Sequence, residues 1–162
     1  MIYLYNINYL SLLLKITNPL RTMTPEKVFQ IANTIVLLPW LLMMIVPHAE
    51  ITKTVINSNA FPLVLAVLYG FYIIKTFGKS GGNFFTLAGV EKLFSKREVL
   101  LAAWIHYLVF DLFVGAWEWR DALQNNISQW VLLPCLILTL MFGPVGYLLY
   151  FGLRVYLVGM PF

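Results

Sequence analysis

The chain has 162 residues, of which 60% are hydrophobic and 11% are charged, and its formal net charge is +4. Because a soluble domain carries about 25% charged residues, this composition indicates an integral membrane protein and excludes an ordinary water-soluble fold. The positive charge does not indicate nucleic-acid binding, since the lysines and arginines are spread over loops between apolar segments, as membrane insertion favours. The lipid bilayer is therefore the first predicted partner.

Residues 1–22 precede the first clear helix start. Their apolar part is too short to cross a bilayer, and they lack the basic segment and the cleavage site of a signal peptide. We expect an upstream extension, with Met23 as the natural start, a single domain over residues 23–157 and a tail over residues 158–162. The lack of an Arg/Ser-rich transit segment favours a bacterial inner membrane, or a plastid membrane if the protein is eukaryotic.

Four apolar segments have the length of membrane-spanning helices. A capping threonine, a first-turn proline and an acid at Thr24-Pro25-Glu26 predict where the first helix begins. The predicted spans cover residues 28–46, 60–77, 100–119 and 130–151.

The loops predict how these spans are oriented. Only Lys53 and Arg120 fall on one side. The other side carries Lys15, Arg21, Lys27, Lys75, Lys79, Lys92, Lys96, Arg97 and Arg154. This asymmetry predicts an all-α, integral membrane four-helix bundle with both termini in the cytoplasm. Apolar residues at helical spacing within residues 87–94 predict a short interfacial helix between spans two and three, with a solvated connector as the alternative.

His106 and Asp111 lie in the middle of the third span and are the candidate catalytic residues. An ionised carboxylate at that depth costs about 2.5–3.5 kcal/mol on insertion scales, so it needs a compensating role. A carboxyl in a dry pocket can stay protonated and donate a proton, and a desolvated imidazole can accept one. The alternatives are a hydrogen-bonded tie between helices for Asp111 and a packing role for His106.

The two residues cannot bond each other on a straight helix. They are five positions apart, which corresponds to about 140° of rotation and ~7.5 Å of rise. We therefore expect each of them to find its partner on a neighbouring helix. A face of span one formed by Gln30, Asn33 and Thr34 is the candidate partner of Asp111.

Further polar and small residues are candidates for substrate binding. Tyr107, Gly115 and Glu118 share or flank the line of Asp111 on the third span. In span four, Gly143 and Pro144 predict a kink that opens a pocket toward span three, close to Thr139. These candidates are Asn33, Tyr107, Gly115, Glu118, Thr139, Gly143 and Pro144.

Several chemistries are not predicted. His106 and Asp111 lack the spacing of a metal pair, and no serine lies within a span to form a hydrolytic triad. Cys135 is the only cysteine, so an intrachain disulfide is excluded. We predict neither a metal nor a cofactor.

Three strings carry a specific resemblance to a known family. They are LAGVEKLFS at residues 87–95, WIHYLVFDLFVGAWE at residues 104–118 and LPCLILTLMFGPVGYLLYF at residues 133–151. The chain resembles the abscisic-acid-deficiency-four family of small four-span membrane proteins over about residues 23–154. The family is named for a plant member that is required for neoxanthin formation.

The resemblance implies a carotenoid or another isoprenoid as ligand. Formation of neoxanthin from violaxanthin opens an epoxide, which needs one proton delivered to oxygen and one removed from the polyene. We expect an isomerase-type reaction with Asp111 as the acid and His106 as the base. A non-catalytic module that binds a lipid or pigment, or that scaffolds a partner enzyme, is the main alternative. A small proton-coupled transporter, acting as a homodimer, is the third.

Overall fold

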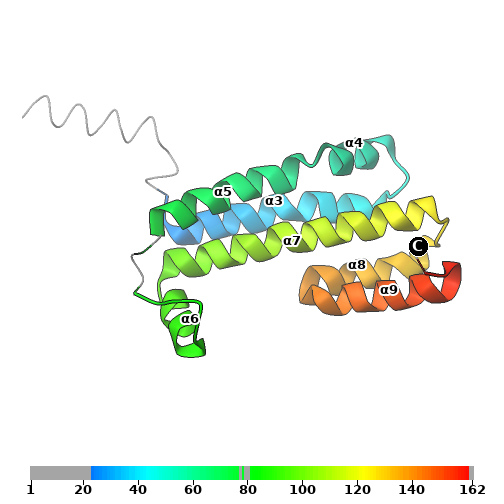
Figure 1. Ribbon diagram of the computed structural model, residues 1–162. Coiled ribbons are helices and arrows are strands. Elements are labelled where there is room, and N and C mark those ends of the chain that lie inside the picture. Colours follow the sequence, from blue (N-terminus) through cyan, green and yellow to red (C-terminus); the bar gives the residue numbers. More distant parts are fainter. Residues whose placement is uncertain (1–22, 77, 79–80, 161–162) are drawn as a thin grey trace, which may run out of the picture.

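The computed structural model describes residues 23–76, 78 and 81–160, and over these residues all regular structure is helical. The elements run along the long axis of the molecule and pack side by side (Figure 1). The all-α class is therefore confirmed. The expected extension at residues 1–22 and the last two residues of the tail lie outside the described part of the chain.

The first long helix begins where the sequence predicts. Helix α3 covers Pro25–Ile45, and the Thr24 side chain accepts a hydrogen bond of 3.4 Å from the Lys27 backbone N–H. A side-chain cap at this position satisfies one of the free N–H groups of the first turn, and Pro25 removes another. The predicted start of span one is confirmed.

The second span is preceded by an additional helix that the sequence analysis did not predict. Helix α4 covers Glu50–Ser58 and helix α5 covers Ala60–Thr76, with Asn59 between them at φ = +52°. Hydrogen bonds made by Thr52 and Arg120 fasten α4 to the rest of the bundle. The Thr52 hydroxyl donates to the Val46 carbonyl at 2.7 Å, and the Arg120 guanidinium donates to the Ile56 carbonyl at 2.9 Å.

A short helix also forms where the sequence predicts one. Helix α6 covers Leu87–Phe94, and the Thr86 side chain caps it by accepting a hydrogen bond from Gly89 N–H at 3.0 Å. Gly89 and Leu93 are its buried residues. The helix lies at the same end of the molecule as the start of α3 (Figure 1). Its location at a membrane interface stays a prediction.

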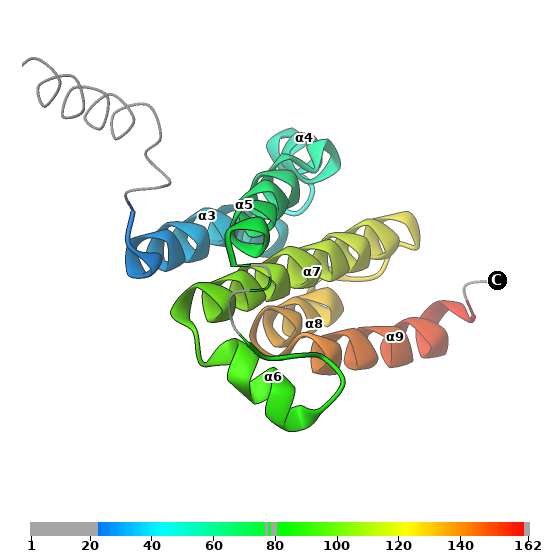
Figure 2. The ribbon, with the colours of Figure 1, turned by 60° about the vertical axis from the view of Figure 1, so that its left-hand side comes forward.

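Helix α7 is the central element of the fold. It covers Arg97–Gln124, or 28 residues, and its length is therefore about 42 Å. It lies between the layer of α3 and α5 and the layer of α8 and α9 (Figure 2). Gly115 lets α3 approach closely, since a Cβ added there would overlap the Trp40 ring. Ile105, Leu112 and Trp119 are among its fully buried side chains.

The predicted fourth span is not one helix, and this prediction is wrong. The segment forms helix α8, Gln129–Phe142, and helix α9, Pro144–Val158, which fold back against each other as a hairpin (Figures 1 and 2). Gly143 lies at the tip with φ = +48°, a conformation that glycine adopts readily. Pro144 has no N–H to continue the helix, so the chain reverses there instead of kinking.

Close packing at Gly146 holds the two arms of the hairpin together. A Cβ added at Gly146 would overlap the backbone nitrogen and hydroxyl of Thr139. The run Gly143-Pro144-Val145-Gly146 therefore combines a glycine for the turn, a proline for the start of α9 and a glycine for the contact between the arms.

The reversal changes the expected topology. Three helical stretches among the described residues are long and apolar enough to cross a membrane, namely Pro25–Ile45, Glu50–Thr76 and Arg97–Gln124, whereas α8 and α9 are shorter. The end of α9 lies at the end of the molecule where α7 ends, opposite the start of α3 (Figure 1). The arrangement with both termini on one side is therefore not reproduced.

The hairpin can be tested by asking which loops share a side. Single cysteines replace Ser95, Asn126 or Met160 in a Cys135→Ser background, and a membrane-impermeant maleimide is applied to sealed vesicles from one side. Because α8 and α9 form a hairpin, we expect positions 126 and 160 to react from the same side and position 95 from the other. A shared side for positions 95 and 160 would restore the four-span arrangement.

The packing between the two arms can be tested at its glycine. Gly146→Ala forces Thr139 to shift, and overpacking of this kind lowers the free energy of unfolding by about 1–3 kcal/mol. Thermal unfolding in mild detergent measures the effect. Gly152→Ala, in the same helix, is the matched control, because an added Cβ there meets no atom within 4 Å. Equal stability of the two variants would contradict the close contact.

Candidate functional site

A line of polar side chains on α7 faces the α8–α9 hairpin. Tyr107, Asp111, Glu118 and Asp121 follow one another at spacings of four, seven and three residues, which places them near one line of the helix. Asp111 and Glu118 are buried, and Asp121 is mostly buried. The line runs from the middle of α7 to its end, so the hairpin covers it from tip to base.

Asp111 lies at the tip of the hairpin. Its residue exposure is 8%, and a Cβ added to Gly143 would lie 2.8 Å from its Oδ1 atom. Gly143 is also the residue that precedes the first turn of α9, so the carboxyl adjoins the positive end of that helix, which favours a negative charge. The Tyr107 side chain interacts with the same carboxyl. The Asp111 Oδ2 atom is buried and has no hydrogen-bond partner among the described residues.

Glu118 lies deeper, between α7 and α8. Its exposure is 0%, and the Thr139 hydroxyl donates a hydrogen bond of 2.8 Å to its Oε1 atom. Its Oε2 atom is buried without a hydrogen-bond partner in the described part of the chain. The Asp111 and Glu118 carboxyls are close enough to interact electrostatically. One polar contact and one unpaired oxygen thus characterise each of the two carboxyls.

Asp121 forms an ion pair at the base of the hairpin. Its carboxylate accepts a hydrogen bond of 2.7 Å from the Tyr150 hydroxyl and pairs with the Arg154 guanidinium at 3.2 Å. The side chains of Arg154 and Asp121 are 8% and 14% exposed. Arg154 also donates to the Gly159 carbonyl, which ties down the end of α9. The base of the hairpin is therefore charge-compensated, while Asp111 and Glu118 have no such cation.

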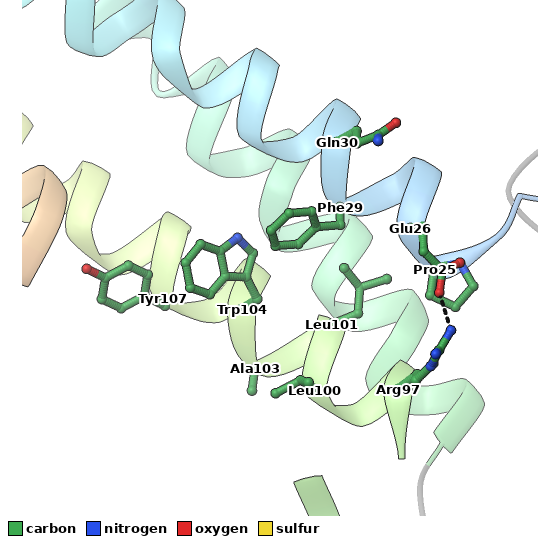
Figure 3. A pocket seen from close by; sticks show the side chains of 10 residues that line it. All are labelled: Pro25, Glu26, Phe29, Gln30, Arg97, Leu100, Leu101, Ala103, Trp104 and Tyr107. Carbon is green, nitrogen blue, oxygen red and sulfur yellow. Dashed lines mark hydrogen bonds and ion pairs between the residues drawn. The ribbon is translucent and has the colours of Figure 1, made fainter. Parts of the chain in front are cut away.

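An open apolar groove of about 760 Å³ runs between the first half of α3 and the first half of α7 (Figure 3). At its outer end Arg97 pairs with Glu26 at 2.6 Å, and Tyr107 lies at its inner end. The groove is lined by Pro25, Glu26, Phe29, Gln30, Arg97, Leu100, Leu101, Ala103, Trp104 and Tyr107. Tyr107 also interacts with Asp111, so this one side chain links the groove to the buried carboxyl, which does not line the groove itself.

The structure does not bring His106 and Asp111 together. The His106 ring is exposed on the outside of the bundle, with its centroid 4.5 Å from that of Phe110 and 5.5 Å from that of Tyr69. Asp111 points toward the hairpin. The separation that helical geometry predicts is thus present, and the two side chains have different surroundings.

The other candidates fall into two groups. Tyr107, Glu118, Thr139, Gly143 and Pro144 gather with Asp111 at the contact between α7 and the hairpin. The remaining two, Asn33 and Gly115, lie toward α3.

The polar face predicted on α3 is not the partner of Asp111. The Asn33 side chain accepts a hydrogen bond of 2.9 Å from the Trp104 indole, and the Thr34 hydroxyl bonds the Gln30 carbonyl of its own helix. Gly115 packs against Trp40 on α3. The prediction that this face is the partner of Asp111 is therefore wrong, because the rotation of α7 turns Asp111 toward the hairpin instead.

Sequence reasoning missed the ion pair at the base of the hairpin. Asp121 follows Glu118 by three residues on the same line of α7, and Arg154 is the only basic residue of α8 and α9. These two facts could have indicated a pair, but only for a folded-back segment, since a continuous fourth span would place Arg154 at the opposite membrane face. Among the described residues, no group of three or more His, Cys, Asp or Glu side chains could hold a metal ion.

These features define a class of helical protein with helices long and apolar enough to span a membrane and a helical hairpin that covers buried carboxyls. The ABA DEFICIENT 4-like family model matches residues 27–150, and the chain belongs to this family. The chain is 34% identical over 138 residues to Protein ABA DEFICIENT 4, chloroplastic, of Arabidopsis thaliana. That match covers 80% of this chain and 61% of the relative, so the chain spans about three fifths of the relative's length. No solved structure matches.

The ion pair at the base of the hairpin can be tested by removing its cation. Arg154→Met leaves the Asp121 carboxylate without a positive partner, and breaking a buried pair in this way lowers the free energy of unfolding by roughly 3–5 kcal/mol. Arg97→Met is the control, because its pair with Glu26 is exposed and is worth about 1 kcal/mol or less. Unfolding in detergent that shows equal losses for the two variants would contradict the structural role of Arg154.

Proposed function

We propose that this protein binds a carotenoid or another elongated isoprenoid in the groove between α3 and α7, and that Asp111 performs acid/base chemistry on it. The observation that carries the proposal is that Tyr107 both lines the groove and interacts with the Asp111 carboxyl. The groove is apolar along its length and ends at Tyr107, which interacts with Asp111. An apolar ligand seated there would have its inner end beside the only acid of that region of α7.

The shape of the groove supports an elongated ligand. On α7 its lining runs from Arg97 to Tyr107, which is about 15 Å of helix. Phe29 and Trp104 face each other across it with ring centroids 5.5 Å apart, and aromatic rings of this kind pack well against a polyene or an isoprenoid chain. The charged pair Glu26–Arg97 at the outer end suits the polar end of such a ligand.

The proposed reaction is the one that the family resemblance suggests. Opening of a carotenoid epoxide needs a proton on the epoxide oxygen, and a buried carboxylic acid at the end of the groove can donate it. His106, the base expected from the sequence, lies on the outer face of α7, so a ligand in the groove and His106 are on different faces of that helix. Binding without catalysis is the alternative, in which Asp111 only orients the ligand.

Proton-coupled transport is a second candidate function, and the hairpin is the observation that favours it. Transporters place helix ends and buried ionisable groups near the middle of the membrane. Asp111 lies close to the midpoint of α7 and adjoins the start of α9. Transport requires uptake of a solute, whereas the isoprenoid function requires a bound ligand.

We also infer a plastid membrane as the location, since the Arabidopsis relative is chloroplastic and three helices are apt to span a membrane. The bacterial inner membrane expected from the sequence finds no support in the comparison.

Violaxanthin is the probe for both parts of the function. Purified protein in mild detergent is mixed with violaxanthin, and bound and converted pigment are separated by chromatography and read by absorbance. We expect wild type to bind and convert it. Asp111→Asn should bind within about twofold but convert ~10²–10⁴-fold more slowly, which is the usual contribution of a general acid. Full conversion by Asp111→Asn would refute the acid role.

The groove has its own variant and matched control. Ala103→Trp fills the groove, and we expect violaxanthin binding to fall at least about tenfold, the equivalent of 1.4 kcal/mol. Leu148→Trp adds the same ring on an exposed position of α9 and should bind as wild type does. Equal binding by both variants would exclude the groove, and His106→Ala shows in the same assay whether the exposed imidazole takes part.

A further inference from the structure

Two buried carboxyls, Asp111 and Glu118, lie under the hairpin, and a negative charge on either of them would need compensation. Each has one oxygen without a hydrogen-bond partner among the described residues. Removing an ionised carboxylate from water costs several kcal/mol unless a cation or hydrogen bonds compensate it. Two adjacent carboxylates repel each other as well, so both cannot be ionised without compensation.

Among the described residues, the hairpin that covers the pair offers no free cation for it. Arg154 is the only basic residue of α8 and α9, and it is paired with Asp121. Arg120, the residue before Asp121 on α7, donates to the Ile56 carbonyl and to the side chains of Asn57 and Asn59 on the opposite side of the bundle.

The neutral neighbours of the pair do not compensate it either. The other titratable groups that interact with the pair are Tyr107 on α7, Cys135 on α8 and Tyr150 on α9. All three are neutral in their ordinary state. They can donate a hydrogen bond but cannot neutralise a second carboxylate.

The two carboxyls also differ in which neighbours could stabilise a charge on them. Asp111 adjoins the positive end of α9, which favours its charged form. Glu118 is fully buried between α7 and α8 and receives a single hydrogen bond, from Thr139, on Oε1. The Oε2 atom is therefore the position where a proton on Glu118 would sit.

We propose that Asp111 and Glu118 form a two-carboxyl site beneath the hairpin tip that holds one exchangeable proton. One carboxyl is protonated and the other is ionised, and the proton passes between their unpaired oxygens through water, since positions 111 and 118 are separated by about 10.5 Å of helix rise. The exchange is balanced, since Asp111–COO⁻ and Glu118–COOH become Asp111–COOH and Glu118–COO⁻. The resting position of the proton is on Glu118.

This site also supplies a proton partner for Asp111, a consequence that rests on the proposed function. In the proposed reaction the proton first passes from Glu118 to Asp111, and Asp111–COOH then gives it to the epoxide oxygen of a ligand in the groove. The proton that the reaction removes from the polyene restores the single proton of the pair. The exposed His106 has no part in this exchange. Glu118 is therefore a proton-storing residue that acts through Asp111.

Infrared spectroscopy of the purified wild-type protein at neutral pH tests the site directly. A protonated carboxylic acid has a carbonyl stretching band that a carboxylate lacks, and the band shifts in deuterium oxide. The other acids of the chain are exposed, half-buried or, for Asp121, paired with Arg154, so we expect one band, from the pair. No band would mean that a bound metal cation compensates the pair, two bands would mean two independent acids, and either result overturns the proposal.

Isosteric variants assign the band. Glu118→Gln should abolish it, because the remaining Asp111 carboxyl is ionised beside the start of α9. Asp111→Asn should keep it at a shifted position, because Glu118 stays protonated with a new partner. Glu50→Gln, an exposed acid, should leave the band unchanged. A band that persists unshifted in Glu118→Gln refutes the assignment, and the wild-type spectrum decides the matter even if a variant fails to fold.

The catalytic consequence has a separate readout. Glu118→Gln should bind violaxanthin as wild type does while its conversion falls at least about tenfold. If wild type binds no violaxanthin, the proposed function fails, yet the infrared band still decides whether the proton site exists. If wild type converts violaxanthin and Glu118→Gln converts it equally well, the function stands and the proton partnership fails.

Discussion

The contact between α7 and the α8–α9 hairpin is the interaction on which the rest of this structure depends. In a chain with so few charged residues, burying three carboxyls on one side of one helix has a large electrostatic cost in free energy. The hairpin covers them by supplying Thr139, Tyr150 and Arg154 from its two arms. Because both arms contribute, neither could be replaced by a straight apolar helix without leaving a buried polar group unsatisfied.

The two faces of α7 serve different purposes. Toward α3 and α5 the helix presents small and apolar residues, and Gly115 allows close contact with Trp40. Toward the hairpin it presents its acids. The groove opens at the start of α7, where the hairpin does not reach, so the groove and the buried acids meet only near Tyr107. Under the proposed function, this division would bring an apolar ligand near Asp111 while the hairpin keeps the carboxyl buried.

Much of the helix content could be predicted from the sequence, and the reversal at Gly143 could not. Thr24 and Pro25 act locally, so their pattern was sufficient to predict the start of α3. Gly143 and Pro144 disturb a helix equally whether they kink it or end it. The choice between these outcomes depends on Arg154 meeting Asp121, 33 residues away, and on Gly146 packing on Thr139. The same holds for the site. Helical spacing separated His106 from Asp111 and placed Glu118 on the line of Asp111, but only packing showed that the α8–α9 hairpin covers both carboxyls.

The reversal at Gly143 has a consequence for how the chain is made. Residues 130–151 are as apolar as a spanning segment, so the machinery that inserts nascent helices would read them as one, whereas the folded protein requires a hairpin. The two outcomes place Arg154 on opposite sides of the bilayer. Its ion pair with Asp121 is available in only one of them. The ion pair therefore stabilises the folded-back arrangement and not a continuous fourth span, and it can form only once α7 is in place, because Asp121 lies near the end of that helix.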